Sequence, residues 1–441
     1  MRPTRTAFNA GGMFPALCVS LLAAAPASVA AQATPAKPTP LEASMDKLAK
    51  HPTVAAAFSA LQSDNAWTLD QQASICQIPA PPFKEQARAA EYAKRFRELG
   101  VQNVRIDKEG NVIGEIRGAK PGPTLMLAGH LDTVFPEGTD VHVKREGTKL
   151  IAPGIGDDCR GLAVVLSVAR QVITQKIPFS GKLLVVGNVG EEGPGNLRGM
   201  RAIFGGPMRD SVDMFISVDG TGFGVTNGGV GSNRYRVHYK GPGGHSWGAF
   251  GQVNPAFAMG NAIARLGKVV VPKRPKVSYN IGVLSGGTSV NSIPYEVAME
   301  VDMRSASPEE LRKIDAEFKR IVAEAVDEEN ATRQTTFGRI TYELKLIGER
   351  PSGTTSPESP LARQVAATMR VYDKVPVWET SSTDANIPIS LGIPAIAVAR
   401  NSATKGGRAH SLDEWTDVEK TQAVRDFELA AAIILGVASM P

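Results

Sequence analysis

Apolar and polar residues follow two different patterns along this chain. In the first, short apolar runs each lead into a loop of glycine and polar residues, and helical spacing lies between some of them. These runs are Thr124–Ala128, Leu183–Asn188, Met214–Val218 and Ala395–Ala399, and the clearest helical stretch is Gly161–Ile173. Strands that alternate with helices predict an α/β sheet domain whose sheet is covered on both faces.

From about Val230 the pattern changes to an alternation of single apolar and polar positions. Tyr235–Tyr239 and Val297–Met303 alternate in this way, which is typical of strands with one wet face. A helix is predicted to begin after Ser307, because a proline and a capping-box glutamate follow it. Its apolar stripe comprises Leu311, Ile314, Phe318, Ile321, Val322 and Ala325. This region is predicted to be a small α+β domain inserted within the larger one.

Five segments are therefore expected: a signal peptide (1–31), a linker (32–45), the first part of the larger domain (46–229), the inserted domain (230–346) and the second part of the larger domain (347–441). Basic residues at the N-terminus precede an apolar run, Gly11–Ala25, and small residues follow it, which is the pattern of a secretory signal. The run is shorter than the ~20 residues of a membrane-spanning helix. We expect an exported protein, periplasmic or extracellular, with no stable membrane anchor after the signal is removed.

Composition and charge narrow the class of protein. A chain of 441 residues with 42% apolar and 21% charged residues can bury a large core without structural metal. Any metal is therefore expected to be catalytic. The formal net charge of +5 comes from basic residues scattered among acidic ones, so no nucleic-acid partner is expected. With Cys18 in the signal, Cys76 and Cys159 remain, and the sequence leaves open whether they pair.

The loops after the apolar runs collect one histidine and four carboxylates. His130 and Asp132 follow the first run, Glu191 and Glu192 the second, and Asp219 the third. Ligands of open α/β sheets bind beyond the carboxyl ends of the strands. Alone, Asp219 would be a simple turn residue and the glutamates a solvated pair. Together, these carboxylates would repel one another unless a cation lay among them, so their joint placement favours a metal site.

Further candidates lie in two glycine-bracketed loops. Asp157 and Asp158 precede the helix that starts near Gly161, where they would either complement the helix dipole or share two cations. His410 follows the last apolar run. Because His130 and Asp132 are two residues apart, they would face the same way on an extended segment, and Asp132 would accept a hydrogen bond from the unused ring nitrogen of His130.

Five motifs in this order resemble the dizinc M20 metallopeptidases, and the likeness spans nearly the whole chain after about Leu69. The family includes peptidase T-type aminopeptidases, glutamate carboxypeptidases and acyl-amino-acid deacylases. The motifs are Gly129–Val134, Gly156-Asp157-Asp158 through Gly161, Gly190–Gly193, Asp219 and His410. The resemblance implies a zinc-peptidase catalytic domain with a mixed sheet and an inserted α+β lid or dimerisation domain.

The resemblance also implies a role for each residue. It assigns His130 and Asp219 to one zinc, Glu192 and His410 to the other, Asp157 to the bridge, Asp132 to the orientation of His130, and Glu191 to the general base. It further implies a cis peptide between Asp157 and Asp158. Two Zn²⁺ per chain are expected, with Co²⁺ or Mn²⁺ as alternatives, and such a pair polarises the scissile carbonyl and lowers the pKa of a water. Without the resemblance, the sequence does not distinguish Glu191 from Glu192.

The inserted domain adds three candidates. His245 resembles the family's lid histidine that reaches a partner subunit's site, which implies a homodimer through this domain. Asn291 and Arg304 resemble binders of a substrate carboxylate, a task that suits the arginine fork. Arg304 could equally pair with an acidic residue of its own strand. The chain departs from the family at Cys159, where many members have Lys or Ser and where a thiol can be oxidised.

The expected function is metal-dependent cleavage of amide bonds in small peptides. In the resembling family, an aspartate at the position of Asp219 favours aminopeptidases and dipeptidases over carboxypeptidases and N-acyl-amino-acid deacylases. A serine hydrolase using Ser246, Asp384 and His410 is an alternative, but a loose glycine-rich loop precedes the serine. A peptide-binding protein without activity is another, and it is disfavoured because neither a ligand nor the base is missing.

Overall fold

The structure of this protein is a computed structural model that describes residues 38–221, 224–401, 407–417, 434 and 437. The fold described below is that of the compact unit that begins at Thr39. The expected signal peptide and residues 32–37 of the expected linker lie outside the described residues. None of the described helices is long and apolar enough to cross a membrane.

Four helices precede the first strand: α1 (Pro40–Ala49), α2 (Pro52–Ser63), α3 (Asn65–Cys76) and α4 (Gln86–Glu98). Helix α1 begins inside the segment that was expected to be a linker. Thr39 and Glu42 form a reciprocal capping box there, and Pro40 occupies the first helical position. Met45 of α1 is buried and contacts Gln364 of helix α9 (Pro360–Val371). Residues 40–45 are therefore part of the folded domain.

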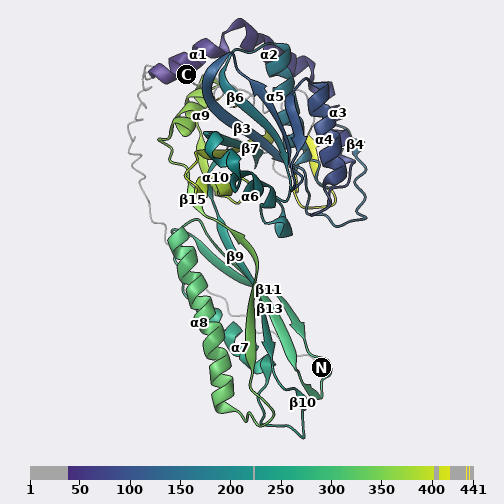
Figure 1. Ribbon diagram of the computed structural model, residues 1–441, viewed down its shortest axis with the longest axis vertical. Coiled ribbons are helices and arrows are strands. Elements are labelled where there is room, and N and C mark those ends of the chain that lie inside the picture. The colour runs from purple at the N-terminus through teal and green to yellow at the C-terminus, as the bar shows by residue number, and fades with distance from the viewer. Residues whose placement is uncertain (1–37, 222–223, 402–406, 418–433, 435–436, 438–441) are drawn as a thin grey trace, which may run out of the picture. The chain divides into compact units, whose positions relative to one another are not determined.

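The larger domain is built on a mixed nine-stranded sheet (Figure 1). Its strands are β1 (Gln102–Ile106), β2 (Val112–Arg117), β3 (Lys120–His130), β6 (Ser180–Asn188), β7 (Met214–Thr221), β8 (Gly224–Gly229), β15 (Gly353–Thr354), β16 (Val377–Ser381) and β17 (Ala395–Asn401). Their order is β1-β2-β6-β3-β7-β17-β8-β15, with β16 paired to β8. β3 is parallel to β6 and β7, and β7 is parallel to β17, whereas β2 and β15 pair antiparallel. The expected α/β sheet is confirmed.

Helices cover both faces of this sheet. Successive residues of β3 alternate between the faces, as the two-residue period of a strand requires. Leu125 and Leu127 pack in the core formed with α4 and α5 (Cys159–Thr174). Met126 and Ala128 pack in the core formed with α6 (Arg198–Phe204) and α10 (Asn386–Ser390). Two short 3₁₀ helices flank α6, η1 (Gly193–Gly195) and η2 (Pro207–Ser211), and β4 (Lys144–Glu146), β5 (Lys149–Ile151) and β18 (Trp415–Asp417) form a separate three-stranded sheet.

The inserted domain has a four-stranded antiparallel sheet in the order β11-β13-β9-β14. Its strands and helices are β9 (Gly231–Lys240), α7 (Pro255–Leu266), β11 (Val277–Gly286), β13 (Glu296–Ser305), α8 (Pro308–Thr332) and β14 (Thr341–Arg350), and β10 (Gly244–His245) pairs with β12 (Ser292–Ile293). Both helices pack on one face of the sheet (Figure 1). Ser307 caps α8, and all six residues of the predicted stripe are buried. The predicted helix is confirmed, and β14 continues four residues past the expected boundary.

Candidate metal centre

The carboxyl ends of three neighbouring strands bring the first candidates together. β3 ends at His130, which lies directly beside Asn188, the last residue of β6. Glu191 and Glu192 follow β6, and Asp219 lies near the end of β7. Because β6, β3 and β7 are parallel neighbours, these ends meet at one edge of the sheet.

Asp157 lies between the two histidines. Its Oδ1 is 3.1 Å from Nε2 of His130, and its Oδ2 is 3.4 Å from Nε2 of His410. The His130 Nε2 atom also lies 3.8 Å from Asp219 Oδ1, and the His410 Nε2 atom lies 3.0 Å from Glu192 Oε1. Within the described residues, the groups whose ligand atoms lie within 4.8 Å of one another are His130, Asp157 and Asp219; His130, Glu191 and Glu192; and Asp157, Glu192 and His410.

The charges of this cluster raise the pKa values of its histidines. Burial by itself would lower the pKa of His130, but the carboxylates of Asp132, Asp157 and Asp219 outweigh burial and raise it well above its usual value. The carboxylates of Asp157 and Glu192 raise the pKa of His410 to about 10. The carboxylates around the two histidines thus concentrate negative charge that a bound cation would neutralise. Imidazole and carboxylate groups are ligands that suit zinc, so the donor set fits the expected metal.

The backbone around Asp157 is fixed by its neighbour. The peptide bond between Asp157 and Asp158 is cis, which confirms the expectation from the resemblance. The Asp158 side chain caps α5 by accepting a hydrogen bond from the Gly161 N–H, and it also accepts one from the backbone N–H of His130. Asp158 therefore ties the Asp157 loop to the end of β3.

Glu414 fastens the same loop from the other side. Its buried carboxylate accepts hydrogen bonds from the backbone N–H groups of Gly154 (3.1 Å), Gly156 (2.9 Å) and Asp157 (2.8 Å). Glu414 immediately precedes β18, which pairs with β5, and lies four residues after His410. The segments that carry Asp157 and His410 are thereby held together.

Asp132 orients His130 differently from the expectation. The Nδ1 atom of His130 is 3.0 Å from the backbone oxygen of Asp132, whereas the nearest carboxylate oxygen lies 3.7 Å away. The Asp132 carboxylate instead accepts hydrogen bonds from the backbone N–H groups of Glu191 and Glu192 at 3.0 and 2.8 Å. Asp132 therefore also fixes the backbone of both glutamates, and the expected side-chain hydrogen bond to the ring is corrected to a main-chain one.

Glu191 is paired with an arginine that the sequence analysis missed. Its Oε1 atom is 2.9 Å from the guanidinium of Arg350, which also donates to the backbone oxygen of Glu191 and to Ser382. Burial raises the pKa of Glu191 well above its usual value, Arg350 opposes this effect, and Glu192 adds to it. Arg350 ends β14, so the inserted domain's last strand delivers a partner to the larger domain's glutamate.

A cavity of about 500 Å³ opens over the cluster. It is lined by Val134, Asp157, Glu191, Glu192, Gly193, Asp219, Thr226, Arg234, Arg304, Arg350, Glu379, Ser381, Ser382, Thr383 and His410. The predicted substrate binder Arg304 is among these residues, and it also forms a 2.6 Å ion pair with Asp302 of its own strand. Neither His245 nor Asn291 lines this cavity. His245 is exposed, and its Nδ1 accepts hydrogen bonds from the backbone N–H groups of Trp247 and Gly248.

Several cavity residues lay outside the sequence analysis. Arg234 and Glu379 carried no motif, and only their places on strands β9 and β16 bring them to the cavity.

Asp384 was considered only as part of a serine-hydrolase triad. It is buried and accepts a hydrogen bond from Asn188, and burial raises its pKa to about 7. His410 contacts Glu192 instead, and Ser246 does not line the cavity, so the triad does not assemble.

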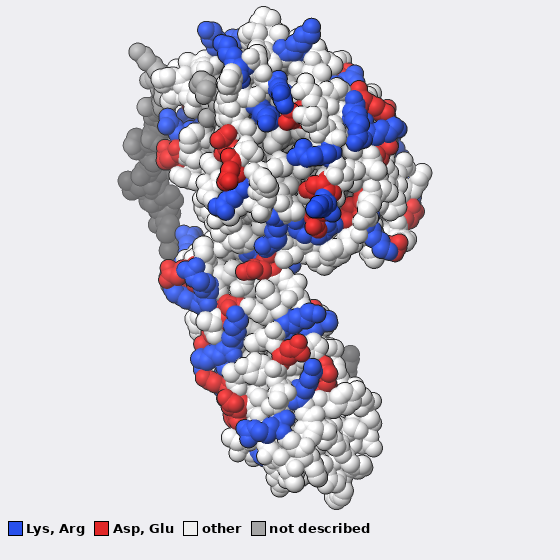
Figure 2. Space-filling view, in the orientation of Figure 1, with Lys and Arg blue, Asp and Glu red and all other residues white. Residues whose placement is uncertain are grey.

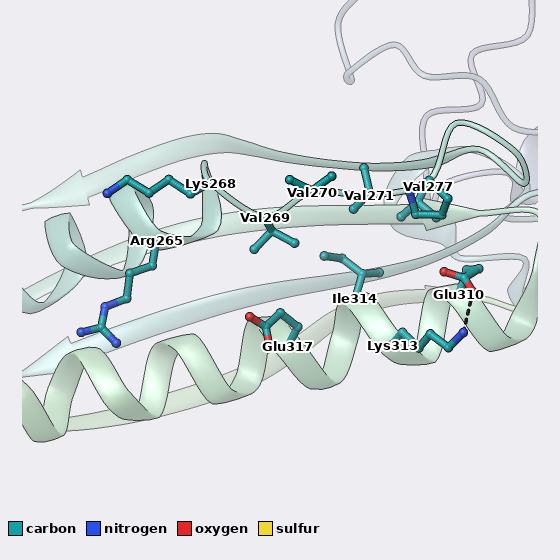
Figure 3. Close-up of a pocket in the computed structure, with 11 residues that line it drawn as sticks. Arg265, Lys268, Val269, Val270, Val271, Val277, Glu310, Lys313, Ile314 and Glu317 are labelled. Carbon is teal, nitrogen blue, oxygen red and sulfur yellow. Dashed lines mark hydrogen bonds and ion pairs between the residues drawn. The ribbon is translucent and has the colours of Figure 1, made fainter.

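A second hollow of about 550 Å³ lies inside the inserted domain, between α8 and the segment that follows α7 (Figure 3). It is lined by Arg265, Lys268, Val269, Val270, Val271, Pro272, Val277, Glu310, Lys313, Ile314 and Glu317. Its charged residues neutralise one another in part, as the 2.7 Å contact between Lys313 and Glu310 shows. No histidine or cysteine lines it, so the cluster at the strand ends is the better candidate for chemistry.

The two cysteines whose pairing the sequence leaves open both lie within the described residues. Cys76 and Cys159 are free and fully buried in a small apolar cluster at the back of the Asp157 loop. The Cys76 thiol donates a hydrogen bond to the backbone oxygen of Pro153.

Comparison with known proteins agrees with this geometry. The sequence model of peptidase family M20/M25/M40 matches residues 126–438. Thermostable carboxypeptidase 1 of Saccharolobus solfataricus is 24% identical over 290 residues, which is 63% of this chain and 73% of that protein. The aminopeptidase PepT of Bacillus cereus superposes with a TM-score of 0.69 at 22% identity, covering 85% of this chain and 99% of that chain. YxeP of Bacillus subtilis, described as a dinuclear metal-binding peptidase, superposes with a TM-score of 0.61 at 16% identity, covering 85% and 99%.

Proposed function

We propose, from the premise that this chain belongs to peptidase family M20/M25/M40, that it binds two zinc ions and hydrolyses the amide bonds of small peptides. Family membership makes the chain a hydrolase. The observation that supports the finer proposal is the position of Asp157, whose two carboxylate oxygens face different histidines. A carboxylate in that position suits a bridge between two cations.

The five ligands divide into two sets around this bridge. His130 and Asp219 would hold one ion, Glu192 and His410 the other, and Asp157 would contact both. Co²⁺ or Mn²⁺ are alternatives to Zn²⁺. When bound, the ions would polarise the scissile carbonyl and lower the pKa of a water molecule.

Glu191 is the residue that we assign to proton transfer. It lies beside the ligand Glu192, lines the cavity, and is held by Arg350 at 2.9 Å. A buried carboxyl whose pKa is raised accepts a proton readily near neutral pH and can return it to the leaving amine. Arg350 keeps the carboxylate in place and aims it into the cavity.

The substrate class rests on two opposing indications. Asp219 favours an aminopeptidase or dipeptidase, and the PepT aminopeptidase shares the fold. A carboxypeptidase stands among the relatives, so a carboxypeptidase or N-acyl-amino-acid deacylase is the second candidate. We propose the aminopeptidase or dipeptidase activity. Hydrolysis rates over a panel of dipeptides, tripeptides and N-acyl-amino acids test this choice, and a preference for N-acyl-amino acids would overturn it.

We further propose a homodimer through the inserted domain, with His245 and Asn291 completing a partner's cavity. Strand β11 is an edge of its sheet and is exposed over most of its length. The side chains of Trp247, Phe250 and Val290 are exposed, and these residues lie close in sequence to β10 or β12. The end of the inserted domain that carries β10 shows few charged side chains on the face in view (Figure 2). An exposed apolar surface of this kind is typical of an interaction site.

Export is part of the same proposal. The N-terminal pattern of basic residues, apolar run and small residues supports a signal peptide and a periplasmic or extracellular location. Comparing the N-terminal sequence of the mature protein with the full chain tests it.

A further inference from the structure

Glu379 is an acidic residue of the cavity that has no place in the metal centre. It lies on β16, where it stands beside Thr226 of β8, and both residues line the cavity. Its side chain is exposed to the cavity. Within the described residues, it has no hydrogen bond or ion pair. Its negative charge is therefore available to a bound molecule.

A glycine makes room for this carboxylate. A Cβ atom added at Gly224 would overlap all three atoms of the Glu379 carboxylate group. The carboxylate thus rests against the bare backbone of β8, in space that any side chain at residue 224 would fill. An alanine at residue 224 would therefore push the flexible end of the Glu379 side chain aside.

The arginines of the cavity already have acidic partners. Arg234 and Arg304 both pair with Asp302, at 3.0 and 2.6 Å, and Arg350 pairs with Glu191. The remaining acids lie in the metal cluster. Among the described residues that line the cavity, Glu379 is therefore the acidic group that lies outside the metal cluster and has no basic partner.

We propose that Glu379 binds the α-ammonium group of the substrate and so selects peptides with a free amino-terminus over N-acylated ones. A buried ligand cation requires a partner of opposite charge, and Glu379 supplies it without drawing on the metal ligands. This inference rests on the proposed peptidase function and specifies its substrate class.

Three substrates that share one scissile amide and one leaving alanine test the inference. Alanyl-alanine carries the α-ammonium group, propanoyl-alanine lacks it, and 6-aminohexanoyl-alanine carries an ammonium group farther from the amide. We expect the native enzyme to prefer alanyl-alanine to propanoyl-alanine. Glu379→Gln should lower kcat/KM for alanyl-alanine by about 10- to 100-fold, since a charge-assisted hydrogen bond is lost, and should affect propanoyl-alanine far less.

Two further variants separate recognition from general damage. Gly224→Ala should displace the carboxylate and reduce the preference for alanyl-alanine in the same direction. Glu358→Gln makes the same chemical change at an exposed residue outside the cavity and should change no ratio. The same comparison measured as Kd by calorimetry, in protein that carries Glu191→Gln, reports binding without turnover.

Each of three results would overturn a different proposal. An unchanged ratio of alanyl-alanine to propanoyl-alanine in Glu379→Gln, in both kcat/KM and Kd, overturns the inference. Loss of activity only towards 6-aminohexanoyl-alanine overturns the assignment to the α-ammonium group. If metal-loaded native protein hydrolyses neither these substrates nor any other amide of the panel, the proposed function fails instead.

Discussion

The two sheets of this molecule use their residues in opposite ways. The nine-stranded sheet is buried on both faces, and its strand ends carry His130, Asp219 and the two glutamates in a tightly held cluster. The four-stranded sheet buries one face under α7 and α8 and leaves its edge strand β11 open. It contributes three arginines to the cavity: Arg234 and Arg304 lie on partly exposed strands, and Arg350 is buried against Glu191.

This difference places the candidate metal ligands in the nine-stranded domain alone. Groups that hold a metal need fixed positions, and the buried sheet supplies them through Asp158 and Glu414, which fasten the loop of Asp157. Groups that contact a substrate need access, and both regions supply them, since Arg234 and Arg304 lie on the inserted domain and Glu379 lies on the nine-stranded sheet. Changes at the candidate ligands of the nine-stranded domain should therefore alter metal content, whereas changes in the inserted domain should alter activity or assembly and leave the metal in place.

Metal removal should have the largest effect. Dialysis against a chelator should lower peptidase activity by at least about 10³-fold, because carbonyl polarisation and water activation are lost together. Metal analysis of the replete protein should give close to two equivalents per chain, and added zinc or cobalt should restore activity. The same chelator saturated with zinc beforehand is the control. Activity that survives chelation and is lost to a serine-reactive phosphonate would contradict the metal mechanism.

The two neighbouring glutamates should separate chemistry from metal binding. Glu191→Gln should keep the metals and reduce kcat by ~10²–10⁴-fold, since the proton acceptor is removed. Glu192→Gln should lower metal occupancy, because its carboxylate contacts His410. Elemental analysis beside kcat measures both. The opposite pattern would show that the two roles are exchanged.

His245→Ala should lower kcat by about 10²-fold with metal content unchanged, because a donor to the developing oxyanion is worth ~3 kcal/mol. Mixing His245→Ala with Glu191→Gln subunits sharpens the comparison. A mixed dimer would contain one site with an intact base and a borrowed histidine, so activity should return. If labelled subunits exchange and no activity returns, His245 does not serve a partner's site. Loss of metal in His245→Ala would break the division between the two regions.

The smallest change in folding stability is expected at the exposed aromatic residues. Replacing Trp247 and Phe250 by serine should change the free energy of unfolding by no more than about 0.5 kcal/mol each, because neither side chain is buried. It should nevertheless shift the protein from dimer to monomer in analytical ultracentrifugation. Phe318→Ala is the matched contrast, since Phe318 is fully buried and its loss should cost about 3–5 kcal/mol. A dimer that persists after both serine substitutions would place the subunit contact elsewhere.

The sequence predicted the features that depend on local patterns. The apolar runs of β3, β6 and β7 and the capped helix α8 follow from spacing alone, and they place His130 and Asp219 at one sheet edge. The capping box of α1 was also local, but its residues lay in a segment whose composition suggested a linker.

The features that the sequence did not predict depend on contacts between distant segments. Glu191 and Arg350 lie 159 residues apart, and neither sequence neighbourhood indicates the ion pair. Glu379 reaches the cavity only because β16 pairs with β8. The hydrogen bonds from the backbone N–H groups of Glu191 and Glu192 to the Asp132 carboxylate also join segments that are far apart in sequence.

The hydrogen bonds between the Glu414 carboxylate and the backbone of the Asp157 loop have a consequence for biosynthesis. The two residues lie 257 positions apart, so a growing polypeptide finishes β3, β6 and β7 well before Glu414 leaves the ribosome. Until then His410 is also missing, and the Asp157 loop lacks the carboxylate that accepts its three backbone N–H groups. A prematurely terminated chain can thus form most of the catalytic sheet while its metal-binding edge stays open. An ion held by Glu192 and His410 could therefore be loaded only after translation has reached this last segment.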